Sequence, residues 1–358
     1  PNAKEAQIIG GGSASLKPHY QVHPFEAIKA RIGSKTEILY SKGCHTHKYL
    51  PKINEKLMVS SDGFLVEYFD GENFKENQLF QENLKGSKFW VFEGFAKEII
   101  GREERSKTSV KFSCAYTPDI SGEHAFEIFG IGQCRMLIDD KELIDNWNNI
   151  EPGEAFFTFG SASRKGFTNF EKGKTYKLEV QYYFEGNFPA LYIGCQPPDK
   201  INLFSEAIDV ASKADAVILI VGTNSDWETE GNDRADLNLP TNQNALIDAV
   251  LNSNKNTALV INTGSPVSIP WSNKAKAILQ TWFAGQEFGN ALFDILSGEI
   301  NPSGKLPTSF PVRIEDTPAF KSYPGKNLQM NYDEKLLIGY RWYEKQSIQP
   351  LFCFGHGL

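Results

Sequence analysis

The strongest constraint on the fold is that one pattern of strands and helices stops, gives way to a second pattern, and then resumes. Residues 5–43 and 200–358 alternate short runs of Val, Ile and Leu with helical patterns. Such alternation predicts parallel strands joined by crossover helices. Residues 61–195 instead carry alternating aromatic and β-branched residues with Gly-rich turns, which is typical of antiparallel strands. The sequence therefore predicts an α/β domain interrupted by an all-β insert.

We assign residues 1–60 and 196–358 to a mostly parallel α/β/α sandwich, and residues 61–195 to an inserted β-sandwich. Such an insertion costs little when its two ends lie close together at a surface loop. The predicted strands of the α/β domain are Ala6–Gly10, Glu37–Tyr40, Ala216–Val221, Thr257–Asn262 and Ala277–Trp282. The predicted helices are Pro24–Arg31, Leu203–Lys213, Asn242–Leu251 and Phe288–Leu296.

Charge and hydropathy exclude two classes of partner. The net charge is -7, and the 37 Lys and Arg residues are scattered, so we expect no nucleic acid. No apolar stretch approaches the roughly 20 residues that a membrane span needs, and residues 1–25 lack a targeting pattern. The sequence leaves the localisation open, secreted or cytoplasmic.

The cysteines and the first glycine-rich stretch predict neither a metal nor a cofactor. Five widely spaced cysteines are an odd number and indicate mostly free thiols. Cys44, His45 and His47 form a short cluster, but a metal site needs three or four converging ligands and no second cluster is visible. GGGSAS (10–15) lacks the spacing of a phosphate-binding loop, so a nucleotide-binding α/β protein is a weak alternative.

The stretch SDWETEGNDRADLNLP (225–240) places five acidic residues directly after a predicted buried strand. Ligands of open parallel sheets gather at this edge of the sheet. A solvated loop, with acids paired to Arg234, is one interpretation. Trp227 favours another, because apolar surface raises a carboxyl pKa toward the range of a general acid and offers a face to a sugar ring. Gly231 permits a turn that projects the Glu230 carboxyl outward.

The same stretch, together with the motifs that follow it, resembles the second domain of family 3 glycoside hydrolases, the β-glucosidases especially. The matching motifs are EGNDRADLNLP, FGNALFDILSGEINPSGKLPTSFP, NYDEKLLIGYRWYEK and PLFCFGHGL, in that order, with GGGSASLKPHYQVHPFEAIKARIG at the start of the domain. The insert resembles a PA14 domain.

This resemblance implies a retaining β-glucosidase, in which an Asp nucleophile and a Glu acid/base flank the scissile bond. Glu230 matches the acid/base and Glu228 is its rival. The family's nucleophile belongs to a preceding (β/α)₈ barrel that this chain lacks, so the chain alone is expected to be inactive. The implied partners are small β-glucosides or oligosaccharides and that barrel, and a homo-oligomer is compatible with the sequence.

The insert adds two hypotheses about ligands. Asp139-Asp140 matches a calcium-binding pair of some PA14 relatives, although a two-residue hairpin turn explains the same letters. Phe156 and Phe157 would point to opposite sides of an extended chain, so that one could stack on a substrate sugar or cover the insert's own core. The alternative function is a carbohydrate-binding PA14 module on an α/β support without catalysis.

Overall fold

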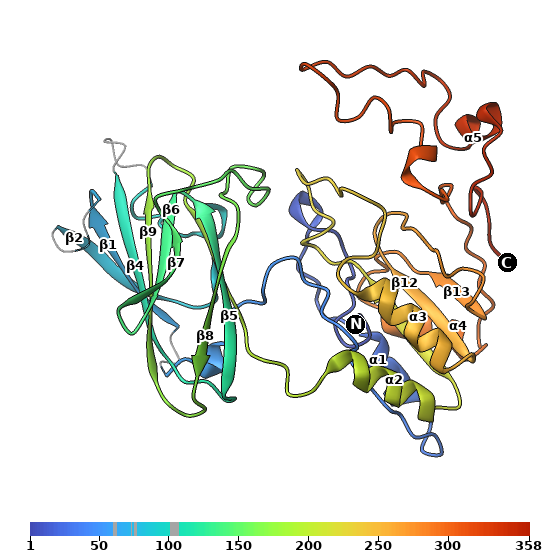
Figure 1. Cartoon of the computed structure of the whole chain (residues 1–358), viewed down its shortest axis with the longest axis horizontal. Helices are drawn as coiled ribbons and strands as arrows, with labels where there is room; N and C mark the ends of the chain where they lie inside the picture. Colours follow the sequence, from blue (N-terminus) through green and yellow to red (C-terminus); the bar gives the residue numbers. More distant parts are fainter. Residues whose placement is uncertain (60–62, 73, 75–76, 101–106) are drawn as a thin grey trace. The chain divides into compact units, whose positions relative to one another are not determined.

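The computed structural model describes residues 1–59, 63–72, 74, 77–100 and 107–358, which form two compact units (Figure 1). The first unit combines Pro1–Thr46 with Ile201–Leu358, and the second is His47–Lys200. Within these described ranges, no helix has the length and apolar character needed to cross a membrane.

The first unit contains a three-stranded parallel sheet with strand order β11-β12-β13. Its strands are β11 (Val217–Gly222), β12 (Thr257–Asn262) and β13 (Ala277–Gln280). Its helices are α1 (Pro24–Arg31), α2 (Leu203–Lys213), α3 (Gln243–Ser253), α4 (Phe288–Leu296) and α5 (Tyr340–Gln346), with short 3₁₀ turns η1 (Gly12–Ala14) and η4 (Ile314–Asp316). The predicted parallel α/β class is thus confirmed for this unit.

Alternate residues of the buried strands face opposite layers of helices, as the period of two requires. Leu219 and Val221 of β11 pack with α2 and α3, whereas Ile220 packs with α4. The same division holds in β12, where Leu259 and Ile261 join the first cluster and Val260 the second. The sheet is therefore buried on both faces, which explains why its strands are continuously apolar in sequence.

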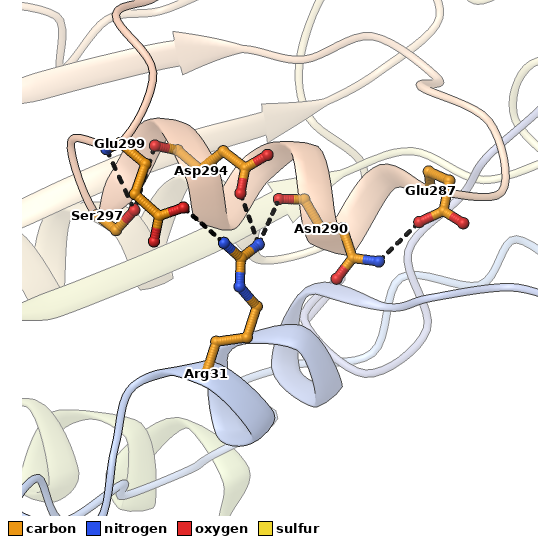
Figure 2. A network of polar contacts seen from close by, with 6 residues as sticks. All are labelled: Arg31, Glu287, Asn290, Asp294, Ser297 and Glu299. Carbon is orange, nitrogen blue, oxygen red and sulfur yellow. Dashed lines mark hydrogen bonds and ion pairs between the residues drawn. The ribbon is translucent and has the colours of Figure 1, made fainter.

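One arginine of α1 makes several polar contacts with α4. Arg31 contacts Asp294 at 2.6 Å and Glu299 at 2.8 Å, and it donates to the Asn290 carbonyl at 3.4 Å (Figure 2). Its guanidinium also lies 4.3 Å from the centre of the Phe293 ring. α1 itself begins where the sequence predicts, with a proline in its first turn, where no backbone N–H is needed.

Two predicted strands do not form in this structure. Ala6–Gly10 pairs instead with the side chain of Asn262, whose Oδ1 accepts from Gln7 N at 2.9 Å and whose Nδ2 donates to Gln7 O at 2.8 Å. Glu37–Tyr40 has no strand partner either, and the Tyr40 ring packs against Phe25 at 5.0 Å. The Ile8 carbonyl also accepts from Gly285 N at 3.0 Å, so the first segment is held by single hydrogen bonds and not by a strand ladder.

The second unit is built from two antiparallel sheets that enclose one aromatic core. The six-stranded sheet has the order β2-β1-β4-β9-β6-β7, and the four-stranded sheet β3-β10-β5-β8. Their bounds are β1 (Phe64–Asp70), β2 (Gln78–Leu84), β3 (Lys88–Trp90), β4 (Thr108–Tyr116), β5 (Gly122–Ile131), β6 (Gln133–Ile138), β7 (Lys141–Asn146), β8 (Arg164–Phe170), β9 (Tyr176–Phe184) and β10 (Ala190–Gln196). The remaining 3₁₀ turns are η2 (Glu55–Leu57) and η3 (Val91–Glu93).

Residues 47–59, which the sequence placed in the α/β domain, pack with the β unit. Ile53 and Met58 are buried in its aromatic core. Cys195 N donates to the Pro51 carbonyl at 2.8 Å, and Val59 N donates to the Ala115 carbonyl at 2.8 Å. The change in sequence pattern at residue 61 was a poor guide here, because this segment contributes isolated backbone contacts and only one short 3₁₀ turn.

Candidate active site

The acidic loop begins at the buried end of β11 and is shaped by its own polar residues. Thr223 N donates to the Asn262 carbonyl at 3.1 Å, which joins the loop to the end of β12. Asn224 then forms a tight turn, because its carbonyl accepts from Trp227 N at 3.1 Å and from Glu228 N at 3.0 Å. The turn brings Trp227 and Glu228 back over the edge of the sheet.

Glu228 holds three parts of the site together. Its Oε1 accepts from the Thr223 hydroxyl and from Gly264 N at 3.0 Å, and its Oε2 accepts from the Ser265 hydroxyl at 3.0 Å. All three contacts use the carboxylate as an acceptor, and the side chain is half-buried. These contacts favour a structural role for Glu228 over the acid/base role that was its alternative.

Glu230 is exposed and bonded to the glycine-rich loop that starts the chain. Its Oε2 accepts from Ser13 N at 3.1 Å and from the Ser13 hydroxyl. These two bonds, the hydroxyl first, hold the pKa of Glu230 below its usual value. This direction is opposite to the upward shift expected from apolar surface beside Trp227, because the donors of Ser13 favour the charged form of Glu230.

Both loops line an open cleft of about 620 Å³ in the first unit. Trp227, Glu228 and Glu230, which the sequence predicted together, all lie in its wall. The cleft is also lined by Gly10, Gly11, Ser13, Ala14, Thr229, Asn232, Asp233, Arg234, Gly264, Ser265 and Phe283. Trp227 is held by its indole, whose Nε1 donates to the Thr46 carbonyl at 2.7 Å. The cleft thus places carboxyl groups beside aromatic side chains, together with several small polar groups.

Arg234 connects the acidic loop to the segment that follows β12. Its guanidinium donates to the Ser265 hydroxyl at 3.1 Å and to the Asn238 carbonyl at 2.9 Å. Burial lowers its pKa, and the nearby charges of Glu228 and Asp236 oppose that shift. It lines both the main cleft and a neighbouring cavity of about 320 Å³.

Sequence reasoning missed Ser13, Ser265 and Phe283 as members of this site. Each lies directly after or near the end of a predicted strand. Ser13 is in GGGSAS (10–15), Ser265 is in NTGSPVS (262–268), and Phe283 stands just before AGQEFG (284–289). The rule that strand ends converge brought these segments to one edge. It could not say which side chain in each segment faces the acids.

Phe156 and Phe157 lie in the β unit and are not extended. Both have positive φ, 52° and 58°, so the predicted alternation of their side chains does not apply. The Phe156 ring is buried 5.8 Å from Phe129 and 5.5 Å from Trp90. Phe157 also contacts Trp90, at 5.5 Å, and is half-buried. The most exposed aromatic of the loop is Phe159, at 76 %.

The weaker metal hypotheses gain no support. Asp139 and Asp140 have φ of 47° and 63° and connect β6 to β7, as a two-residue hairpin turn requires. Asp139 Oδ1 accepts from Lys177 N, and Asp140 contacts Lys177 Nζ at 2.6 Å. Among the residues that the structure describes, no three His, Cys, Asp or Glu side chains converge as metal ligands. The sequence indicated mostly free thiols, and in the structure all five cysteines are free and four are buried.

Comparison with known proteins decides the family. The sequence model of the glycosyl hydrolase family 3 C-terminal domain matches residues 1–358. This chain belongs to that family. The family 3 domain is 37% identical over 379 aligned residues to probable β-glucosidase I of Emericella nidulans, and 33% identical over 368 residues to a β-glucosidase of Rhizobium radiobacter. Each match covers 100% of this chain and 44% of the relative, so the chain spans less than half the length of these relatives.

Solved structures of β-glucosidases resemble the fold over the whole chain. The β-glucosidase of Kluyveromyces marxianus in complex with glucose has a TM-score of 0.86 at 30% identity, covering 100% of this chain and 44% of that one. A β-glucosidase of Streptomyces venezuelae in complex with D-glucose has a TM-score of 0.59 at 28% identity, covering 100% and 40%. The family 3 domain therefore shares its architecture with enzymes named as β-glucosidases.

Proposed function

We propose that the protein containing this family 3 domain is a retaining β-glucosidase that hydrolyses terminal non-reducing β-D-glucosyl residues. The observation that carries this proposal is the exposed carboxyl of Glu230 in a cleft that also presents Trp227. An acidic group and an aromatic face in one cleft suit protonation of a glycosidic oxygen beside a bound sugar ring. The names of the relatives agree with this chemistry.

In the proposed reaction Glu230 acts twice. Its carboxylic proton first moves to the glycosidic oxygen while an Asp nucleophile, which we place in the barrel that relatives of this kind carry before this domain, bonds to the anomeric carbon. The glycosidic bond breaks and the aglycone leaves as an alcohol. The Glu230 carboxylate then removes a proton from water, whose oxygen displaces the Asp and releases glucose.

Because the acid/base and the nucleophile lie in different domains in this proposal, we predict that the 358-residue chain alone does not hydrolyse β-glucosides. We expect it to hydrolyse 4-nitrophenyl β-glucoside at least about 10³-fold more slowly than the full-length protein, because one member of a cooperating pair is missing. Proton NMR of the full-length reaction should show the β-anomer of glucose formed first. First appearance of the α-anomer, or comparable turnover by the chain alone, would contradict the proposal.

A second candidate function, sugar binding by the β unit, is favoured by one surface feature. Among its large hydrophobic side chains, three highly exposed ones are aromatic: Phe92, Phe159 and Phe188 have exposed fractions of 72 %, 76 % and 61 %. Phe92 lies 5.2 Å from Trp90 and 6.2 Å from Phe188, so two of them belong to one cluster. Solvent-exposed rings offer faces on which pyranose rings can stack.

This candidate predicts that Phe92→Ala weakens binding of cello-oligosaccharides to the chain. We expect a loss of about 5- to 10-fold in affinity by isothermal titration calorimetry, the size of one lost ring contact. Phe167→Ala is the matched control, because Phe167 is equally apolar, 58 % exposed and lies on β8 of the same unit. Equal affinities for the wild type and both variants would leave the β unit without a binding role.

A further inference from the structure

Ser13 presents two donors to the same oxygen of Glu230. Its backbone N–H reaches Oε2 at 3.1 Å, and its hydroxyl donates to Oε2 as well. The second carboxylate oxygen, Oε1, is left to carry the proton that a general acid must deliver. The two residues are 217 positions apart in the sequence, so their contact depends on how the two loops are packed.

The glycines before Ser13 make this close packing feasible. A Cβ on Gly11 would lie 2.5 Å from the Ser225 carbonyl oxygen, and a Cβ on Gly12 would lie 2.7 Å from Glu230 Cβ. Gly12 also has a φ of +64°, which L side chains rarely adopt. Gly11 N donates to the Glu228 carbonyl at 2.9 Å and fixes the register of the two loops. Any side chain at either glycine would push Ser13 away from Glu230.

We propose that Ser13 is a positioning residue for Glu230: it fixes Oε2 and stabilises the carboxylate that forms as the proton leaves Oε1. This inference rests on the proposed function. Negative charge develops on Glu230 while its proton passes to the glycosidic oxygen and the bond to the anomeric carbon breaks. Donors already aimed at that charge stabilise the transition state without reorganising. The same donors then hold the carboxylate that acts as base in the second step.

The test is Ser13→Ala in the full-length enzyme, assayed with two leaving groups. We expect kcat/KM for phenyl β-glucoside to fall about tenfold, because misplacing a catalytic group by a fraction of an ångström has effects of this order. For 2,4-dinitrophenyl β-glucoside we expect a change of less than about twofold, since its leaving group needs no proton. A defect of folding or substrate binding would lower both values equally, and that outcome would overturn the inference.

The pH profile provides the second readout. Ser13 lowers the pKa of Glu230, so removing the hydroxyl should raise it and move the basic limb of kcat/KM to higher pH. Ser13→Thr keeps the hydroxyl, so its basic limb and its kcat/KM for phenyl β-glucoside should both match those of the wild type. Ser15→Ala is the control, because the Ser15 hydroxyl donates to the Gly12 carbonyl at 2.7 Å rather than to Glu230. A basic limb that stays in place in Ser13→Ala would count against the proposal.

Failure of this inference can be told apart from failure of the proposed function. If Glu230→Gln loses activity on phenyl β-glucoside but Ser13→Ala behaves as the wild type, only the positioning role is wrong. If Glu230→Gln keeps wild-type activity on that substrate, Glu230 is not the acid and the positioning role fails with it.

Discussion

Replacing Glu230 with glutamine in the full-length protein is expected to lower kcat/KM for phenyl β-glucoside by about 10²- to 10⁴-fold, the usual contribution of a general acid. Glutamine has nearly the same shape but no acidic proton to give to the glycosidic oxygen. Because Glu230 is exposed, the substitution should leave the free energy of unfolding within about 0.5 kcal/mol of the wild type. Steady-state kinetics and urea unfolding measure the two effects separately.

The choice of leaving group makes this experiment specific for proton donation. With 2,4-dinitrophenyl β-glucoside, kcat/KM of Glu230→Gln should stay close to the wild-type value, since glycosylation no longer needs an acid. Glu228→Gln is the matched control on the same loop. Its carboxylate accepts from Thr223, Gly264 and Ser265, so its loss should disturb the loop and affect both substrates alike. Selective loss on phenyl β-glucoside in Glu228→Gln instead would reassign the acid to Glu228.

Local periodicity was sufficient to predict most of the helices and the parallel sheet. α1, α2 and α4 have the predicted bounds, and β12 does as well. The helices bury one face, which leaves an apolar period in the sequence, and the strand is buried on both faces, which leaves a short continuous apolar run. The same reasoning, extended to strand ends, placed the acidic loop and the glycine-rich loop at one edge of the sheet. Glu230 itself was chosen from its match to the family 3 motif, since the strand ends alone do not distinguish it from the other acids of the loop.

What the sequence could not supply were contacts made by single side chains across the unit. Ser13 appeared as a turn residue, because nothing local in GGGSAS signals that its hydroxyl reaches Glu230. The side chains of Phe156 and Phe157 were expected to diverge if the chain were extended there, but both residues have positive φ. The apolar run Ala6–Gly10 has the composition of a strand, but the backbone N–H and C=O of Gln7 bond to the Asn262 side chain, and the Ile8 carbonyl accepts from Gly285 N. Such choices depend on partners that are remote in sequence.

Asn262 is the side chain on which we expect the first unit to depend most. It is fully buried, and both ends of its amide are used. Oδ1 accepts from Asn2 Nδ2 at 3.1 Å and from Gln7 N at 2.9 Å, while Nδ2 donates to Gln7 O at 2.8 Å and to Trp282 O at 2.7 Å. One amide therefore connects β12 to the start of the chain and to the segment that follows β13.

Asn262→Ala should destabilise the first unit by about 3 to 5 kcal/mol, because it leaves several buried backbone groups without partners at about 1 to 3 kcal/mol each. Urea unfolding followed by tryptophan fluorescence measures this loss. Hydrogen exchange should show reduced protection of residues 1–9 and 281–286 first. Asn256→Ala is the control, since Asn256 lies just before the same strand but is exposed, and it should stay within about 0.5 kcal/mol of the wild type.

The same variant connects stability with the site, because residues 2–7 lead directly into the loop that carries Ser13. If Asn262 holds that segment in place, Asn262→Ala should also weaken the contact of Ser13 with Glu230. In the full-length enzyme, kcat/KM should then fall more for phenyl than for 2,4-dinitrophenyl β-glucoside, as in Ser13→Ala. Normal stability in Asn262→Ala would show that water replaces the amide. Equal losses on both substrates would show instead that the segment affects the fold without guiding the acid.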